Sequence, residues 1–114
     1  MTSWEDVVTM ALALPGAELS RSYGRPAIKV RGKAFAATGR KDDHFVLWAT
    51  LDEVDMLIET EPRVFFQTDH YKGWPAVLVR YATADPERIA ALLERAWQRR
   101  ASKAQRKERD HRLG

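Results

Sequence analysis

Residues 27–38 read AIKVRGKAFAAT, two short apolar segments separated by the dipeptide Arg31-Gly32. A glycine at the second position of a two-residue loop suits a tight β-hairpin, because such turns require a positive φ. In this register Ile28 lies opposite Phe35, which gives the hairpin an apolar pair across its strands. The stretch therefore predicts two antiparallel strands, over residues 27–30 and 33–38.

Further segments on both sides of this hairpin have the composition of strands. One precedes it over residues 19–23, and two follow it over residues 44–49 and 76–81. The segment 44–49 carries large apolar side chains on both faces, as a strand inside a sheet does. The short run 64–66, Val-Phe-Phe, fits either a strand or a turn. We expect an antiparallel sheet of about five strands.

Two helices with one apolar face bracket these strands. The first is predicted from the helical spacing of apolar residues at positions 4, 7, 8, 11 and 12. Thr2 and Glu5 fit a capping box at its start. The last helix has a similar stripe at positions 89, 92, 93, 96 and 97, and begins at Asp85-Pro86. Between them, Thr50 and Glu53 form a second capping box that opens a short helix ended by Pro62.

This order of elements predicts an α+β fold, with the N- and C-terminal helices packed on one face of an antiparallel sheet. We expect residues 1–100 to form a single domain. Residues 101–114 form a basic C-terminal tail in which the apolar stripe ends, and it is either a frayed extension of the last helix or disordered. The tail is a phosphate-binding arm or a solubilising end.

The composition is that of a soluble globular protein. The chain has 114 residues, 45% of them hydrophobic and 31% charged, and it contains no cysteine. No apolar run approaches the roughly 20 residues that a membrane helix needs. Glu5 and Asp6 lie where a secretory signal would be positively charged. We expect a cytoplasmic protein that does not act at a membrane.

The charges are strongly segregated along the chain. Residues 21–41 contain seven basic residues and no acidic one, whereas residues 42–61 contain seven acidic residues and neither lysine nor arginine. The acidic stretch is most simply a solvated helix face and a turn. The two stretches are also able to pair with each other, within one chain or between two.

The sequence contains no pattern typical of a catalytic or metal site. It has no G-x-S-x-G elbow, no phosphate-binding glycine loop and no H-E-x-x-H motif. Its three histidines lie far apart and lack metal-ligand spacing. His70 follows Asp69, an arrangement similar to an oriented general base, but adjacent side chains usually point apart. We expect no enzymatic activity, no metal and no cofactor.

A binding function is better supported, by two clusters of residues. The basic stretch combines cations with Tyr23 and Phe35, as nucleic-acid-binding surfaces do; the alternative is the solvated side of a half-buried sheet. The loop TDHYKGWP, residues 68–75, presents large polar and aromatic side chains before a strand, and loops on a rigid scaffold often carry binding groups. The predicted nucleic-acid contacts are Arg21, Tyr23, Arg25, Lys29, Arg31, Lys33, Arg40, Lys41, His70, Tyr71, Lys72 and Trp74.

Three blocks of sequence are similar, in order and spacing, to those of a known family. They are ALALPGAELSRSYGRPAIKVRGKAFA (11–36), FFQTDHYKGWPAVLVR (65–80) and LLERAWQRRA (92–101). In these blocks, which extend over nearly all of residues 1–100, the chain resembles the MmcQ/YjbR family of small bacterial proteins. The family pattern falls here on Tyr23, Gly24, Pro26, Lys29, Gly32, Lys33, Phe35, His70, Tyr71, Gly73, Trp74 and Pro75.

The resemblance implies a sheet of about five strands with two terminal helices, similar to the frataxin/CyaY-like sandwich. It also implies DNA binding, the function with which the family is commonly labelled. The basic hairpin would contact phosphates, and the loop from His70 to Trp74 would stack on bases or enter a groove. The alternative is a non-catalytic binding module for an anionic small molecule or a protein partner, which uses Tyr71, Lys72 and Trp74.

Overall fold

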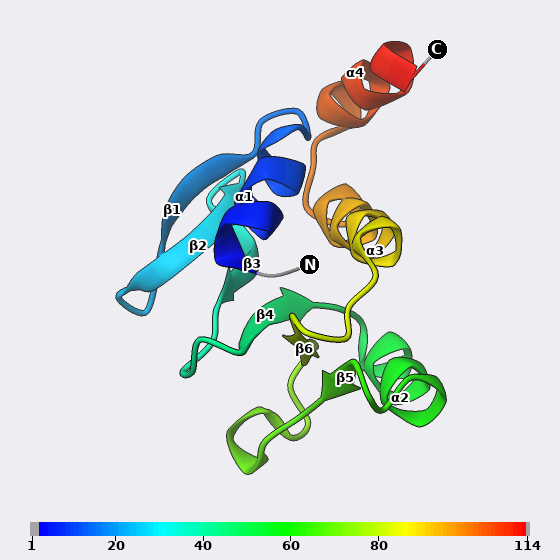
Figure 1. The fold of residues 1–114 in the computed structure, drawn as a ribbon. Helices are drawn as coiled ribbons and strands as arrows, with labels where there is room; N and C mark the ends of the chain where they lie inside the picture. Colours follow the sequence, from blue (N-terminus) through cyan, green and yellow to red (C-terminus); the bar gives the residue numbers. More distant parts are fainter. Residues whose placement is uncertain (1–2, 114) are drawn as a thin grey trace.

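The computed structural model describes residues 3–113. Along the chain they form α1 (Trp4–Leu12), β1 (Glu18–Ser22), β2 (Arg25–Val30), β3 (Lys33–Thr38), β4 (His44–Trp48), α2 (Leu51–Thr60), β5 (Phe65–Phe66), the 3-10 helix η1 (Asp69–Tyr71), β6 (Ala76–Arg80), α3 (Pro86–Gln98) and α4 (Lys103–Leu113). Figure 1 shows α1 and α3 lying side by side over the strands.

The strands form one antiparallel sheet in the order β1-β2-β3-β4-β6-β5. The predicted α+β class is therefore confirmed, with one short strand more than the five expected. That sixth strand is β5, where Phe65 pairs with Val79 and Phe66 with Leu78. The sequence left this run open between a strand and a turn, and pairing to the edge of β6 makes it a strand.

The β2–β3 hairpin has the predicted turn, but the predicted pairing of Ile28 with Phe35 is wrong. Beside the turn Val30 pairs with Lys33, as a two-residue loop requires. A β-bulge then shifts the register, so that Ile28 pairs with Ala36. Phe35 becomes the extra residue of the bulge. As a result Phe35 and Ala36 are both buried in the core under the helices.

The larger core lies between the sheet and the helices, on what we call the helix face. The helices supply buried side chains that include Val7, Leu57 and Ile89. Trp97 of α3 is fully buried, and its indole Nε1–H donates a hydrogen bond of 2.8 Å to the backbone oxygen of Pro15. A buried indole needs such a partner, and here the bond ties α3 to the chain that follows α1.

The opposite side of the sheet, the open face, has a smaller core. Its buried residues come from four strands, and they are Ala27, Ala37, Val46, Ala76 and Leu78. Trp48, Phe66 and Tyr71 pack against them. Because alanine side chains are small, they leave space above this face of the sheet, and the three rings occupy that space. The segment after β5, residues 67–75, thus covers part of the open face through Tyr71.

Two of the helix starts have the caps that the sequence predicts. The Thr50 hydroxyl accepts a hydrogen bond of 3.2 Å from the backbone N–H of Glu53, and the Asp85 carboxylate accepts one from Arg88 N–H. The capping box predicted for α1 cannot be compared, since Thr2 lies outside the described residues. Ser3 occupies the N-cap position of α1, without a side-chain cap bond.

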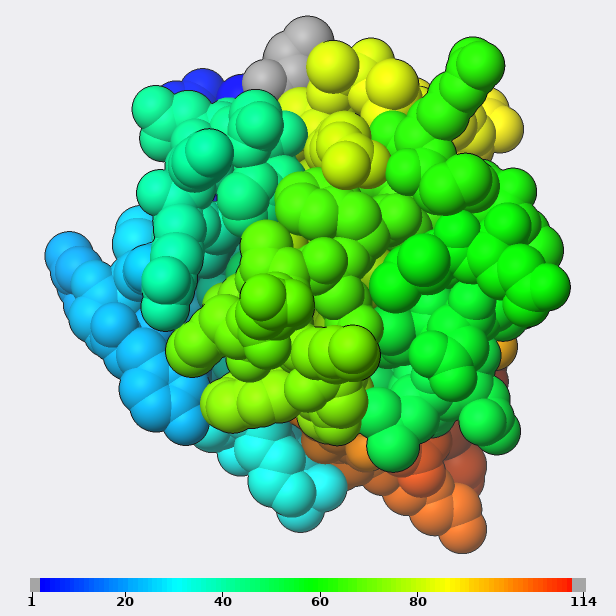
Figure 2. All heavy atoms as spheres, turned by 90° about the horizontal axis from the view of Figure 1, so that it is seen from below, coloured from blue at the N-terminus to red at the C-terminus, as the bar shows by residue number. Residues whose placement is uncertain are grey.

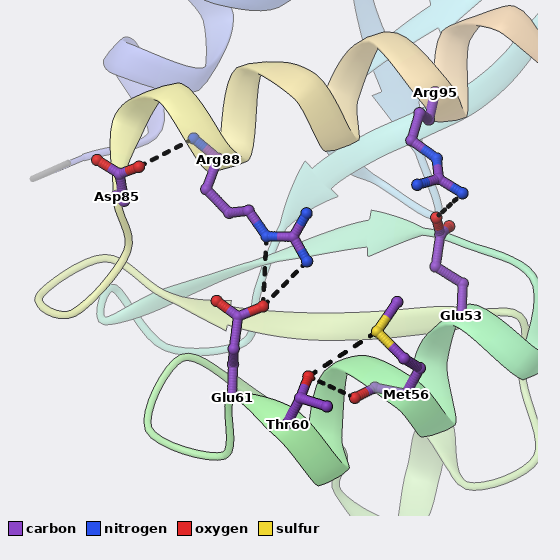
Figure 3. Close-up of polar contacts among 7 residues, drawn as sticks. All are labelled: Glu53, Met56, Thr60, Glu61, Asp85, Arg88 and Arg95. Atoms are coloured by element: carbon purple, nitrogen blue, oxygen red, sulfur yellow. Dashed lines mark hydrogen bonds and ion pairs between the residues drawn. The ribbon is translucent and has the colours of Figure 1, made fainter.

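Asp52, Asp55 and Glu59 of α2 are exposed, as the predicted solvated helix face requires, but Glu53 is buried. The Glu53 side chain is only 5% exposed, and its carboxylate pairs with Arg95 at 3.0 Å and with Arg99 at 3.5 Å. At the other end of the interface, Glu61 accepts hydrogen bonds from Arg88. Figure 3 shows Glu53 of α2 and Glu61, the C-cap residue of α2, both pointing toward arginines of α3. These acids therefore pair with α3 and not with the basic stretch.

Residues 103–113 form the regular helix α4, so the expectation of a frayed extension of the last helix or a disordered tail is wrong for these residues. A reciprocal capping box begins it: Ser102 N–H donates to Gln105 Oε1 at 2.8 Å, and Gln105 N–H donates to Ser102 Oγ at 3.1 Å. Arg109 then pairs with Glu94 of α3 at 2.8 Å. The motif S-x-x-Q at residues 102–105 is the sequence signal of this cap. Among the helices described, none has the length and apolar character to cross a membrane.

Candidate binding pocket

A pocket of about 320 Å³ opens on the open face of the sheet. We call it the open-face pocket. Its lining residues are Ser22, Tyr23, Arg25, Ala37, Thr38, Arg40, Trp48, His70, Tyr71 and Trp74. They come from the β1–β2 turn, the end of β3 and the chain after it, the end of β4, and the loop 67–75. Figure 2 shows the yellow-green loop near residue 70 and the blue and blue-green segments on the same surface of the molecule.

Three rings of the loop form one wall of the pocket. The His70 ring stacks on Trp74, with centroids 5.9 Å apart and an interplanar angle of 28°. Tyr71 meets both of them edge to face, with centroids 4.9 Å from His70 and 6.0 Å from Trp74. Tyr71 also packs against the open-face core, whereas Trp74 is 44% exposed. The wall thus has an anchored ring and an accessible one.

Gln67 holds this loop in place through its side-chain amide. The Nε2 group donates to the backbone oxygens of Tyr71 at 3.0 Å and Ala76 at 2.8 Å, and lies 3.4 Å from that of Trp74. One side chain therefore connects the start, the middle and the end of the loop. Neither spacing nor composition singles out Gln67 in the sequence, because its role depends on how the loop closes.

The opposite rim is the β1–β2 turn. Ser22 pairs with Arg25, so the loop consists of Tyr23 and Gly24 alone. Both have a positive φ, 52° and 78°, as a type I′ turn requires. The Arg21 guanidinium donates a hydrogen bond of 3.1 Å to the oxygen of Gly24 and braces the turn. Arg21 itself faces a second groove with Trp4 and Leu19, so it does not line the open-face pocket.

The structure divides the predicted basic residues between several places. Arg25 and Arg40 line the open-face pocket. Within residues 3–113, no ion pair joins either of them to a carboxylate. The other predicted bases lie outside the pocket lining, and they are Arg21, Lys29, Arg31, Lys33, Lys41 and Lys72. The predicted basic residues are therefore divided between the lining of the open-face pocket and other parts of the surface.

Trp48 is a pocket residue that the sequence did not assign. It ends β4, half-buried, and packs against the open-face core. Arg99, the C-cap residue of α3, donates a hydrogen bond of 3.2 Å to the backbone oxygen of Trp48. Because Arg99 also pairs with Glu53, the helix face supports the position of this ring. The sequence showed a strand with large groups on both faces, but not which ring would border a hollow.

The chain between β3 and β4 carries Arg40 and is held by an adjacent acid–histidine pair. The Asp43 carboxylate lies 2.7 Å from His44 Nδ1, and this hydrogen bond is the main reason that the pKa of Asp43 lies below its ordinary value. His44 is buried against Phe66 and contacts Gly39, where a Cβ atom would overlap the imidazole. His44, paired with Asp43, thus packs against Gly39, the residue before Arg40.

The groups that line the pocket differ in the chemistry that they offer to a ligand. The partners of the His70 ring are the aromatic rings of Tyr71 and Trp74. Within the described part of the chain, no group of three or more His, Cys, Asp or Glu residues could hold a metal ion. What the pocket does supply is aromatic surface, two guanidinium groups and the hydroxyls of Ser22 and Thr38.

Comparison with known proteins matches most of the chain to one family. The family model described as YjbR matches residues 12–99. The crystal structure of Deinococcus radiodurans protein DR2400, with the family-model domain DUF419, superposes with a TM-score of 0.73 and covers 95% of this chain and 88% of that one. Its sequence is 19% identical, so this likeness concerns the fold.

Two mycobacterial proteins share a shorter stretch of sequence. They are the uncharacterized protein Rv2570 of Mycobacterium tuberculosis and the uncharacterized protein Mb2600 of Mycobacterium bovis. Each is 45% identical over 47 residues, which is 41% of this chain and 36% of the relative. The chain thus matches about a third of the length of these curated relatives.

Proposed function

The chain belongs to the YjbR family, and we propose that this member is a non-catalytic binding module that takes a compact anionic ligand in the open-face pocket. The observation that carries the proposal is that Arg25 and Arg40 line the same hollow as the aromatic wall. A guanidinium group binds carboxylate or phosphate oxygens with paired hydrogen bonds.

The positive charge of the lining distinguishes this pocket from aromatic-lined sites that bind cations. Rings such as Trp48, Tyr71 and Trp74 would also suit a quaternary ammonium ligand, which binds over aromatic faces. Two arginines in the same lining repel a cation, so an anion is favoured. The volume of about 320 Å³ lies at the small end of the usual range for ligand pockets, which is roughly 300–1,000 Å³. A small molecule fits it better than a folded partner.

The proposal is tested by calorimetric titration of anions into the protein. The probes are inorganic pyrophosphate and adenosine monophosphate, with choline as the cationic counterpart. We expect binding of at least one anion and none of choline. Arg25→Ala and Arg40→Ala should each weaken that binding by about tenfold, because a charge-assisted hydrogen bond is lost.

The matched control is Arg31→Ala, which removes a guanidinium from the other hairpin turn, outside the pocket. It should leave the dissociation constant within about twofold of the wild type. Equal losses in Arg31→Ala and Arg25→Ala would mean that only the overall charge matters. Absence of anion binding in the wild type would refute the proposal.

DNA binding is a second candidate, favoured by the position of Lys29. Ala27, two residues earlier on β2, belongs to the open-face core, and Ala34, the pairing partner of Lys29, packs against it. Lys29 therefore points to the same side of the sheet as the pocket. Beyond it lie the exposed Arg31 and Lys33, so cations extend from the pocket toward the hairpin tip.

The two candidates differ in how binding responds to salt. The logarithm of the affinity for DNA falls as the logarithm of the salt concentration rises. Removal of one phosphate contact makes this slope shallower by about one. For a DNA-binding module, Lys29→Ala, Arg31→Ala and Lys33→Ala should each lower that slope, measured by fluorescence anisotropy of a labelled duplex. If the three variants leave the slope unchanged, or no duplex binds at low salt, the DNA candidate is wrong.

A further inference from the structure

We infer that the ligand of the open-face pocket carries a planar aromatic ring beside its anionic group, and that Tyr23 is the residue that selects the ring. The ligand class is then an aromatic phosphate or carboxylate, of which a nucleoside monophosphate is the simplest example. This inference rests on the proposed function and makes it more specific.

The first observation is the backbone of Tyr23. Its φ of 52° lies in the left-handed region, which a bulky side chain occupies at a cost. The first position of a type I′ turn is usually asparagine, aspartate or glycine. Residues held in such conformations are concentrated at functional sites. A tyrosine at this position therefore needs a reason other than the turn.

The second observation is that packing in the folded protein does not explain the tyrosine at position 23. Tyr23 is 92% exposed, the highest value among the exposed large hydrophobic residues, so its ring contributes almost nothing to either core. It nevertheless borders the open-face pocket, which Tyr71 and Trp74 also line. An aromatic ring left in water at the mouth of a pocket is available to a ligand.

The third observation is the set of rings that the pocket offers. Trp48 ends β4 and the loop rings precede β6, whereas Tyr23 follows β1, and β2 and β3 lie between β1 and β4 in the sheet. A planar ring between Tyr23 and the other rings would contact aromatic surface on both sides. A ligand without a ring would use only Arg25 and Arg40. Tyr23 thus separates ring-bearing anions from simple ones.

The chain contains a matched control for this idea. The β2–β3 turn, Arg31-Gly32, has the same backbone geometry, with φ values of 54° and 76°. Arg31 lies outside the pocket lining. Asparagine is suited to both turns, so Tyr23→Asn and Arg31→Asn should both keep or raise the urea midpoint of unfolding. Loss of binding in the first variant would then not be a loss of folding.

The experiment measures adenosine monophosphate and inorganic pyrophosphate on the wild type and these variants by calorimetry. Tyr23→Asn should weaken the monophosphate by about tenfold, since stacking on one aromatic side chain is lost, and leave pyrophosphate within about twofold. Tyr23→Phe should bind both as the wild type does. Arg31→Asn should change neither.

Several results would overturn the inference. If the wild type binds pyrophosphate and Tyr23→Asn binds the monophosphate as tightly as the wild type does, the ring selection is wrong while the proposed function stands. The same conclusion follows if the wild type binds pyrophosphate as tightly as the monophosphate. If the wild type binds neither probe, the proposed function fails and this inference fails with it.

Discussion

The side-chain amide of Gln67 donates a hydrogen bond of 2.8 Å to the backbone oxygen of Ala76, across the base of the loop that forms the aromatic wall. The same nitrogen bonds to the oxygen of Tyr71. Since the buried strand β6 begins at Ala76, this hydrogen bond anchors the loop to the sheet. The position of Trp74 relative to the pocket therefore depends on a residue that does not line it.

Substitution of Gln67 should loosen the aromatic wall without unfolding the protein. Gln67→Ala removes the side-chain donor to the Ala76 and Tyr71 oxygens, of which the Tyr71 oxygen keeps its hydrogen bond from Trp74 N–H, so we expect a loss of about 1 kcal/mol in the free energy of unfolding. Gln67→Glu should cost more, because a carboxylate would face the carbonyl oxygens of Tyr71 and Ala76. Urea denaturation checks both. Gln98→Ala, at an exposed glutamine of α3, is the control and should stay within about 0.5 kcal/mol.

Among the acidic residues of α2, Glu53 is the one whose substitution should lower the free energy of unfolding most. Its buried carboxylate pairs with Arg95 and Arg99, and Arg99 also supports Trp48. Glu53→Gln removes the charge from both pairs and should lower the free energy of unfolding by about 1–3 kcal/mol. The exposed Glu59 provides the comparison, since Glu59→Gln should have little effect. Equal effects of the two substitutions would contradict this account of the α2–α3 interface.

Tyr81 gives the fold a predictable response to alkali. Burial, together with the nearby Asp42 and Asp6, raises the pKa of Tyr81 to about 12 from an ordinary value of 10.0. The folded state thus favours the neutral phenol. The raised pKa of Tyr81 contributes to the free energy of unfolding. This contribution is fully present below pH 10 and is lost as the pH rises toward 12, by about 1.4 kcal/mol per pH unit.

Denaturation of Tyr81→Phe tests this prediction. Phenylalanine keeps the ring that stacks on Phe45, with centroids 5.6 Å apart, and removes the ionising group. The variant should therefore lose less stability than the wild type between pH 10 and pH 12. Tyr23→Phe, at an exposed tyrosine, should follow the wild type. A parallel decline of Tyr81→Phe and wild type would show that Tyr81 is not responsible.

Most of the fold was predictable because local patterns and packing agree. Helical stripes, capping residues and the turn Arg31-Gly32 each specify their element within a few residues of sequence. The bulge at Phe35 was not predictable in this way, because it depends on packing both Phe35 and Ala36 against the helices. The burial of Glu53 likewise depends on arginines about 40 residues away, on α3.

The site was predictable only in part. Tyr23, Arg25, Arg40 and the loop rings line the pocket, whereas the other basic residues of the stretch lie elsewhere. Net charge along a chain does not indicate which face of the sheet each side chain occupies. Trp48 joins the pocket because the alanines beside it leave a depression in the open face. That depression is a property of the assembled sheet.

The most direct test uses the four tryptophans as reporters of where a ligand binds. Trp48 and Trp74 line the open-face pocket, Trp4 lines the second groove, and Trp97 is fully buried on the helix face. Their indole N–H signals are followed by nuclear magnetic resonance of ¹⁵N-labelled protein during titration with adenosine monophosphate. We predict saturable shifts of the Trp48 and Trp74 signals, with Trp4 and Trp97 unchanged. Shifts confined to Trp4, or no shift in any of the four, would contradict the assignment of the open-face pocket as the binding site.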